Sequence, residues 1–217
     1  MGLEAFRCLI KEHPQITHVS FIGGESFMNK DFFAIMEHLD RKGITYEITT
    51  NGTLINEQTI DRLKGCIGLK NILFSLDGLE ASHDKERGAG TFKKCVHALG
   101  LMKGHFTTGV CSVFKADNQD DLIELTRMLA DMDVNDHRII YGMSHSEEAV
   151  AESRKLAPHL VFQGPRFDRQ VVDYERTMKF FETLEQAARA RQIKVSYVPE
   201  LFRSRTKPFL DGNLAQT

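Results

Sequence analysis

Short runs of apolar and β-branched residues alternate along the chain with longer amphipathic segments. Six runs are candidate strands: His18–Ile22, Thr45–Thr50, Asn71–Leu76, Thr108–Phe114, His137–Tyr141 and Lys194–Val198. Several of them are near-continuous runs, as expected for strands that are covered on both faces. The amphipathic segments have apolar positions at helical spacing over residues 3–10, 32–39, 92–102, 122–132 and 171–188. This alternation predicts an α/β fold with a parallel sheet, either open or curled into a full or partial barrel.

One stretch, residues 142–170, interrupts the alternation and contains Pro158, Gly164 and Pro165. A long excursion after a strand is typical of a lid over a binding site, and equally of a surface insertion. We expect one domain over residues 1–217, with the excursion inside it and with residues 194–217 as a terminal strand and tail.

Composition narrows the class of protein. The chain has 217 residues, of which 41% are hydrophobic and 27% charged, with a net charge of −2. These values are those of an ordinary globular domain, and no run of basic residues favours nucleic acid. No apolar stretch approaches the ~20 residues of a membrane helix, and the N-terminus has no signal-peptide core. We therefore expect a cytoplasmic protein without membrane or nucleic-acid partners.

Polar and glycine residues gather where the predicted strands end. In a parallel sheet these ends lie on one face, which is where α/β folds bind ligands. The residues concerned are Gly23, Gly24 and Glu25 after the first strand, Asn51 after the second, and Ser75 and Asp77 at the end of the third. A carboxylate directly after two glycines repels phosphate and attracts ammonium, so the ring favours a ligand with an amine and hydroxyls. The alternative is that these are ordinary turn residues.

The segment His83–Gly88 follows shortly afterwards and contains Arg87. The guanidinium of Arg87 has the geometry to bind a carboxylate at the same mouth. The alternative is a solvated loop. Phosphate-binding and hydrolase motifs are absent from the sequence, and the nine histidines lack metal-ligand spacing.

Taken together, these motifs resemble the radical S-adenosylmethionine superfamily, nearest its peptide-modifying and anaerobic sulfatase-maturing branch. The resemblance covers about residues 16–141 and rests on four motifs in the family's order: Val19–Glu25, Thr49–Ile55, Phe74–Gly78, and His83–Gly88 with Gly90–Phe92. It implies a partial (β/α)6 TIM-like barrel.

The resemblance also implies roles for individual residues. Gly23, Gly24 and Glu25 would bind the amino end of S-adenosylmethionine, and Arg87 would pair with its methionine carboxylate. Ser75 would contact the ribose or methionine part, with Asn51 and Asp77 close by and Tyr141 near the adenine. In the family, a 4Fe–4S cluster supplied with electrons by a flavodoxin or ferredoxin generates a 5′-deoxyadenosyl radical, which abstracts hydrogen from a peptide or small-molecule substrate.

The cluster ligands of the family do not occur in this sequence. The family holds its cluster with Cys-x3-Cys-x2-Cys before Gly-Gly-Glu, whereas the four cysteines here are Cys8, Cys66, Cys95 and Cys111. We expect either a truncated core that lacks the first barrel strand and the cluster loop, inactive alone, or a cluster-less relative that binds a ligand or partner.

The same observations lead to one prediction about the sheet edge and to one alternative function. A missing first strand would leave His18–Ile22 as an open sheet edge, which predicts self-association. A third reading is an unrelated (β/α)-barrel enzyme that uses Glu25, Asp77 and Arg87 for acid–base chemistry.

Overall fold

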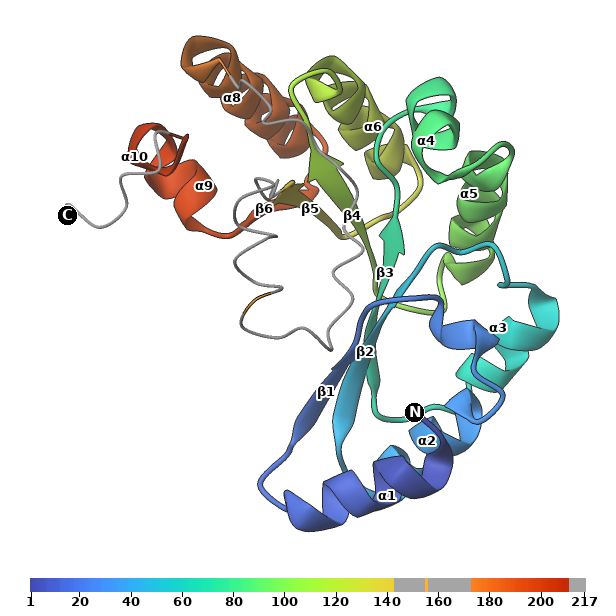
Figure 1. Cartoon of the computed structure of the whole chain (residues 1–217). Coiled ribbons are helices and arrows are strands. Elements are labelled where there is room, and N and C mark those ends of the chain that lie inside the picture. Colours follow the sequence, from blue (N-terminus) through green and yellow to red (C-terminus); the bar gives the residue numbers. More distant parts are fainter. Residues whose placement is uncertain (143–154, 156–172, 211–217) are drawn as a thin grey trace.

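The computed structural model describes residues 1–142, 155 and 173–210. Six parallel strands form one sheet in sequence order (Figure 1). They are β1 (His18–Phe21), β2 (Thr45–Thr50), β3 (Leu69–Ser75), β4 (Thr108–Phe114), β5 (Asp136–Tyr141) and β6 (Lys194–Val198). This order confirms the predicted α/β fold with a partial TIM-like barrel. The excursion at 142–170 lies outside the described residues except for Gly142 and Lys155, and so does the tail after Leu210.

Helices line one side of the curved sheet (Figure 1). They are α1 (Leu3–Glu12), α2 (Phe32–Lys42), α3 (Glu57–Leu63), α4 (Glu80–Arg87), α5 (Thr91–Met102), α6 (Gln119–Asp131) and α8 (Tyr174–Ala190), and two short helices follow β6, α9 (Leu201–Ser204) and α10 (Thr206–Leu210). Residues 80–87, for which a solvated loop was the alternative, form helix α4. None of the described helices has the length and apolar character needed to cross a membrane.

The core lies between the helices and the sheet. In β2 the side chains of Tyr46, Ile48 and Thr50 are buried, and the residues between them are partly exposed. Burial of each large apolar side chain contributes about 1.5–3 kcal/mol, so this face supplies most of the stability. The expectation that the strands are covered on both faces is confirmed for the central strand β4 and is wrong for β2.

The opposite, concave face of β2 and β5 is polar. The Arg138 guanidinium bonds to Asp136 through Nε at 2.8 Å, and its Nη2 lies 3.7 Å from a Glu47 oxygen. Ser20 Oγ donates to the other Glu47 oxygen at 3.0 Å. This ion pairing between strands that are not neighbours explains why Glu47 and Arg138 are tolerated within strands.

Strand β1 lies at the edge of the sheet and pairs only with β2 among the described residues. Its Phe21 ring packs against Phe6 and Phe32, with centroids 6.1 and 5.0 Å away, so the strand is anchored by its helix-facing side chains. The predicted self-association through this edge stays a prediction.

Candidate functional site

The loop after β1 is tied to the end of β2 by the carboxylate of Glu25. Its Oε1 accepts a hydrogen bond from Thr50 Oγ1 at 2.9 Å, and its Oε2 accepts one from the Asn51 backbone N–H at 2.8 Å. Oε1 also accepts from the N–H of Phe27 at 3.2 Å, at the start of the short 3-10 helix η1 (Ser26–Met28). The carboxylate is therefore engaged in holding the loop after β1 against the end of β2.

The two glycines before Glu25 present backbone to solvent. Both are exposed, and a Cβ at either position would meet no atom within 4 Å. Gly23 has a φ of +93°, a left-handed conformation that favours glycine. The loop thus leaves bare peptide groups exposed at the strand-end face.

Asn51 forms the turn that ends β2. Its Oδ1 accepts from the N–H and the hydroxyl of Thr53 at 2.9 and 2.7 Å. Gly52 follows with a φ of +73°, and a Cβ there would lie 3.1 Å from Cys95 Cα. The turn at Asn51–Gly52 is therefore specified by local bonding and by close contact with α5.

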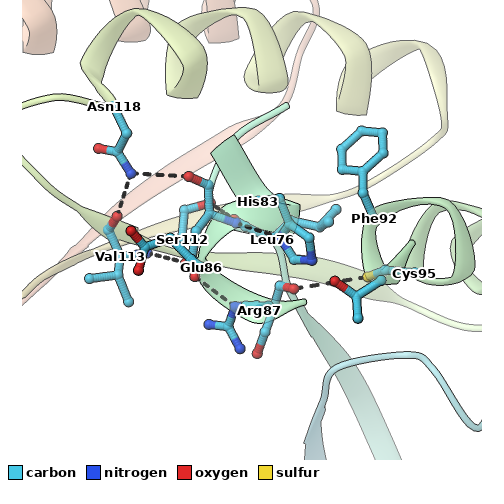
Figure 2. A network of polar contacts seen from close by, with 12 residues as sticks. Leu76, His83, Glu86, Arg87, Phe92, Cys95, Ser112, Val113 and Asn118 are labelled. Atoms are coloured by element: carbon cyan, nitrogen blue, oxygen red, sulfur yellow. Dashed lines mark hydrogen bonds and ion pairs between the residues drawn. The ribbon is translucent and has the colours of Figure 1, made fainter. Parts of the chain in front are cut away.

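Asp77, which follows β3, is a buried centre of polar contacts. Its Oδ1 accepts from the Val113 N–H at 2.8 Å, and its Oδ2 accepts from Arg87 Nε at 2.6 Å. Asn118 Nδ2 donates to the Asp77 carbonyl at 3.0 Å. Figure 2 shows Arg87, Val113 and Asn118 around the end of β3.

The ion pair with Asp77 fixes the guanidinium of Arg87 and leaves most of its donors unused. The bond uses only Nε, and the side chain of Arg87 is 32% exposed against 6% for Asp77. The Nη groups bond to no other residue in the described ranges. A guanidinium anchored through Nε presents its Nη groups as a fork for a carboxylate.

The segment from α4 to α5 is held by Asp84. Its carboxylate accepts from the N–H groups of Gly90 and Phe92 at 2.6 and 2.8 Å. These backbone bonds hold the pKa of Asp84 below its usual value. Asp84 thereby closes the loop that follows Arg87.

Several residues of this site have roles that no sequence signal assigns. They are Thr50, His83, Asp84, Ser112 and Asn118, which bond to the predicted site residues or hold their loops. Thr50, His83 and Asp84 lie inside motifs quoted above, so the sequence marks their positions without assigning them a role.

The side chains of Tyr141 and Ser75 lie on opposite sides of the sheet. The Tyr141 ring packs among the helix-facing aromatics, with centroids 4.8 Å from Phe202 and 6.2 Å from Phe114. A contact with adenine would therefore come from the backbone at the end of β5, and it stays a prediction. Ser75 ends β3 with a partly exposed side chain on the concave side.

The four cysteines lie apart. Cys8 is exposed on α1, and Cys66 follows α3. Burial raises the pKa of Cys95 to about 12 and that of Cys111 to about 11, so both stay thiols. No three metal-ligating side chains gather anywhere in the described part of the chain, so its residues do not fit a 4Fe–4S cluster.

The arrangement argues against free acid–base catalysis. Glu25 and Asp77 both accept backbone N–H bonds, and Asp77 is also paired with Arg87. The oxygens of both carboxylates are therefore engaged in bonds within the chain, which leaves neither group free to work on a substrate. What remains exposed at the strand ends is the backbone of Gly23 and Gly24 and part of the Arg87 side chain.

Comparison with known proteins identifies the family of the chain. The profile of the radical SAM superfamily matches residues 3–129, more than half of the chain. An Fe-coproporphyrin III synthase of Methanosarcina barkeri is 29% identical over 177 residues, covering 76% of this chain and 40% of the relative. A mycofactocin maturase of Mycobacterium ulcerans is 33% identical over 91 residues, covering 41% of this chain and 24% of the relative.

The fold matches solved structures as well. Streptococcus suis SuiB bound to S-adenosylmethionine superimposes with a TM-score of 0.69 at 14% identity, covering 91% of this chain and 43% of SuiB. The chain spans less than half the length of the curated relatives that it matches. Since the superfamily profile covers α1 through most of α6, the chain belongs to the radical SAM superfamily.

Proposed function

We propose that the strand-end face binds S-adenosylmethionine through the two charged ends of its methionine part. The observation that carries this proposal is the anchored guanidinium of Arg87, held by Asp77 through Nε at 2.6 Å. It offers paired N–H donors to the carboxylate of the ligand. The amino group of the ligand would bond to the bare backbone of Gly23 and Gly24, beside the negative charge of Glu25.

The remaining predicted residues would complete the pocket. Ser75 at the end of β3 would contact the ribose or methionine part, with Asn51 nearby and the backbone of Tyr141 near the adenine. Asp77 acts on the ligand through Arg87, because its own oxygens are taken by Val113 and Arg87.

The proposal extends to a radical enzyme core acting on a peptide or a small molecule. Membership of the superfamily supports the radical chemistry, and the relatives include both a maturase and a porphyrin-handling synthase. The cluster of the family would supply an electron to the bound S-adenosylmethionine, with a flavodoxin or ferredoxin as reductant. The described residues hold no ligand set for that cluster, so no radical step is derived from this chain, and ligand binding without catalysis is the alternative.

The proposed bond between Arg87 and the carboxylate of the ligand can be tested with two ligands that differ only in that carboxylate. Isothermal titration would compare S-adenosylmethionine with its decarboxylated analogue on the wild type and on Arg87→Gln. We expect the wild type to prefer the carboxylated ligand at least ten-fold, since a hydrogen bond to a charged group contributes about 1.5–3 kcal/mol. Arg87→Gln should bind both ligands equally weakly.

Arg7→Gln is the matched control, because Arg7 lies on α1 and pairs with Glu4. This variant should keep the wild-type preference. Equal affinity of the wild-type chain for the two ligands would sink the assignment of Arg87.

A further inference from the structure

The peptide group between Leu76 and Asp77 is hydrogen-bonded on both sides by buried side chains. The Leu76 carbonyl accepts from the hydroxyl of Ser112, and the Asp77 N–H donates to His83 Nδ1 at 3.2 Å. Figure 2 shows Leu76, Ser112 and His83 close together at the end of β3. This peptide joins β3 to the loop that carries Asp77, so its orientation sets the position of the Asp77 carboxylate.

The bond from Ser112 replaces a missing sheet bond. The Leu76 N–H donates to the Cys111 carbonyl, so regular parallel pairing would bring the Val113 N–H to the Leu76 carbonyl. The Val113 N–H instead donates to Asp77 Oδ1. The Leu76 carbonyl therefore lacks its regular backbone donor, and the hydroxyl of Ser112 donates to it instead.

The protonation of His137 follows from this bond. A hydroxyl has one proton, and that of Ser112 goes to Leu76. The Ser112 oxygen therefore accepts from His137 Nε2, which lies 2.7 Å away. The hydroxyl of Thr126 lies 2.8 Å from both His137 Nδ1 and the Leu122 carbonyl, and its one proton can serve only one of them. Because burial lowers the pKa of His137 to about 3, the ring carries a single proton, so Nδ1 is an acceptor and takes the Thr126 proton. His137 is a neutral imidazole with its proton on Nε2.

His83 has the same tautomer for a different reason. Its Nδ1 accepts from a backbone N–H, so its proton lies on Nε2. The ring is 1% exposed and packs edge-on against Phe92, with centroids 5.9 Å apart. His83 therefore contributes to the clamp only while it is neutral, whereas His137 contributes as the donor to Ser112.

We propose that His83 and His137 are positioning residues that hold the Leu76–Asp77 peptide, and through it Asp77 and Arg87, in the arrangement that binds a carboxylate. The inference rests on the proposed binding of S-adenosylmethionine. It gives a role to two residues behind Arg87. The His83 ring of α4 and the His137 ring of β5 support the Leu76–Asp77 peptide from opposite sides.

His83 is the ring that acid would affect first. Burial lowers its pKa, the charge of Arg87 lowers it further, and Asp77 and Asp84 oppose this. Burial lowers the pKa of His137 to about 3. A neutral His83 is favoured above the unfolded pKa of about 6.5, and the clamp is lost as the pH falls through the lower folded value. A protonated Nδ1 of His83 would be a second donor facing the Asp77 N–H, so the hydrogen bond between them would be lost.

Two substitutions of His83 separate positioning from packing. Asn places its Oδ1 where the histidine has Nδ1, so His83→Asn keeps an acceptor for Asp77, and His83→Leu removes it. For S-adenosylmethionine measured by titration calorimetry at pH 7.5, we expect His83→Asn to stay within about three-fold of wild type. His83→Leu should lose at least ten-fold, because a buried donor left unsatisfied costs about 1–3 kcal/mol. His83→Asn should also abolish the loss of affinity that we expect of wild type as the pH falls through the lowered pKa of His83.

Nitrogen NMR of the full chain tests the clamp without any ligand. Both rings should show an unprotonated Nδ1 and a protonated Nε2 at pH 7.5, and the Asp77 amide should exchange faster in His83→Leu than in His83→Asn. A proton on Nδ1 of either ring would overturn the inference. So would equal affinities of the two His83 variants, and that result would leave the proposed function standing. No binding of S-adenosylmethionine by the wild type, with both rings as expected, would instead refute the proposed function.

Discussion

The strand ends of the two halves of the sheet are built from different chemistry. At the ends of β1 to β3, Glu25 and Asp77 each accept a backbone N–H from the end of a neighbouring strand. At the end of β5, the Tyr141 ring packs 4.8 Å from the Phe202 centroid, inside an aromatic cluster. The strand ends of the first half hold charged groups in fixed positions, and those of the second half bury aromatic surface.

The contrast shows how a carboxylate in a ligand-binding mouth can work indirectly. Glu25 bonds to Thr50 and Asn51, and Asp77 to Val113 and Arg87. Charge-assisted bonds of this kind are short and directional, so they fix loops that apolar contacts alone would leave free. Under the proposed function, the ligand would meet backbone and guanidinium groups whose positions the carboxylates determine.

The largest effect should come from Asp77→Ala. The substitution leaves Arg87 without its anchor and the Val113 N–H without its acceptor, so we expect the unfolding free energy to fall by about 2–3 kcal/mol and affinity for S-adenosylmethionine to fall about 100-fold. Urea unfolding and calorimetry measure the two. Asp77→Asn keeps an acceptor for Val113 and should lose less stability. If Asp77→Ala kept the affinity of wild type, binding at the first half would not depend on the ion pair between Asp77 and Arg87.

The strands were predictable because their side chains follow simple patterns. All six predicted runs lie on observed strands, and β2, β4 and β6 have the predicted bounds. Helix α4 was not predicted, because His83 is its only buried residue and no apolar stripe marks it. An element held by polar contacts gives no periodic signal in a single sequence.

The site was predictable in its location and not in its bonding. The polar residues after β1 to β3 do share one end of the sheet, as parallel strands require. The partners of Asp77, Val113 and Asn118, lie 36 and 41 residues further along the chain, and nothing local links them. Tyr141 shows the other limit: neighbouring strand residues face opposite sides, so its place at a strand end does not settle where its ring points.

A substitution in the second half should affect stability and leave the binding face intact. Tyr141→Leu removes ring contacts with Phe114 and Phe202, and we expect it to cost about 2 kcal/mol of unfolding free energy. Thermal and urea unfolding measure the loss. Affinity for S-adenosylmethionine should stay within two-fold of wild type at a temperature where the variant is folded. A ten-fold weaker affinity would instead give the Tyr141 ring a role at the ligand.

Glu25→Gln should have a smaller effect on stability and a measurable one on binding. The amide keeps one oxygen for Thr50 and Phe27 but turns its NH2 towards the Asn51 N–H. We expect a cost of about 1 kcal/mol in unfolding free energy and a several-fold loss of affinity for S-adenosylmethionine. Amide exchange of Asn51 should rise in parallel. Lower affinity without faster exchange would mean that the Glu25 charge, and not its hold on the loop, supports the ligand.

The smallest effect should come from Glu185→Gln, in the second half. Glu185 Oε1 accepts from Arg203 Nε at 2.7 Å and from the Tyr197 hydroxyl at 3.1 Å. The bond from Arg203 holds the pKa of Glu185 below its usual value. Its contribution to stability is therefore present above the unfolded pKa of about 4.3 and is lost as the pH falls through the lower folded value.

Because this pair is partly exposed, Glu185→Gln should cost at most about 1 kcal/mol at pH 7. Urea unfolding from pH 7 to pH 3 should show a shallower loss of stability than in wild type, since the variant has one carboxylate fewer to protonate. Affinity for S-adenosylmethionine should not change, because Glu185 and Arg203 bond within α8, β6 and α9, away from Asp77 and Arg87. A changed affinity would show that the aromatic half transmits strain to the charged half, and the two would then have to be treated as one coupled unit.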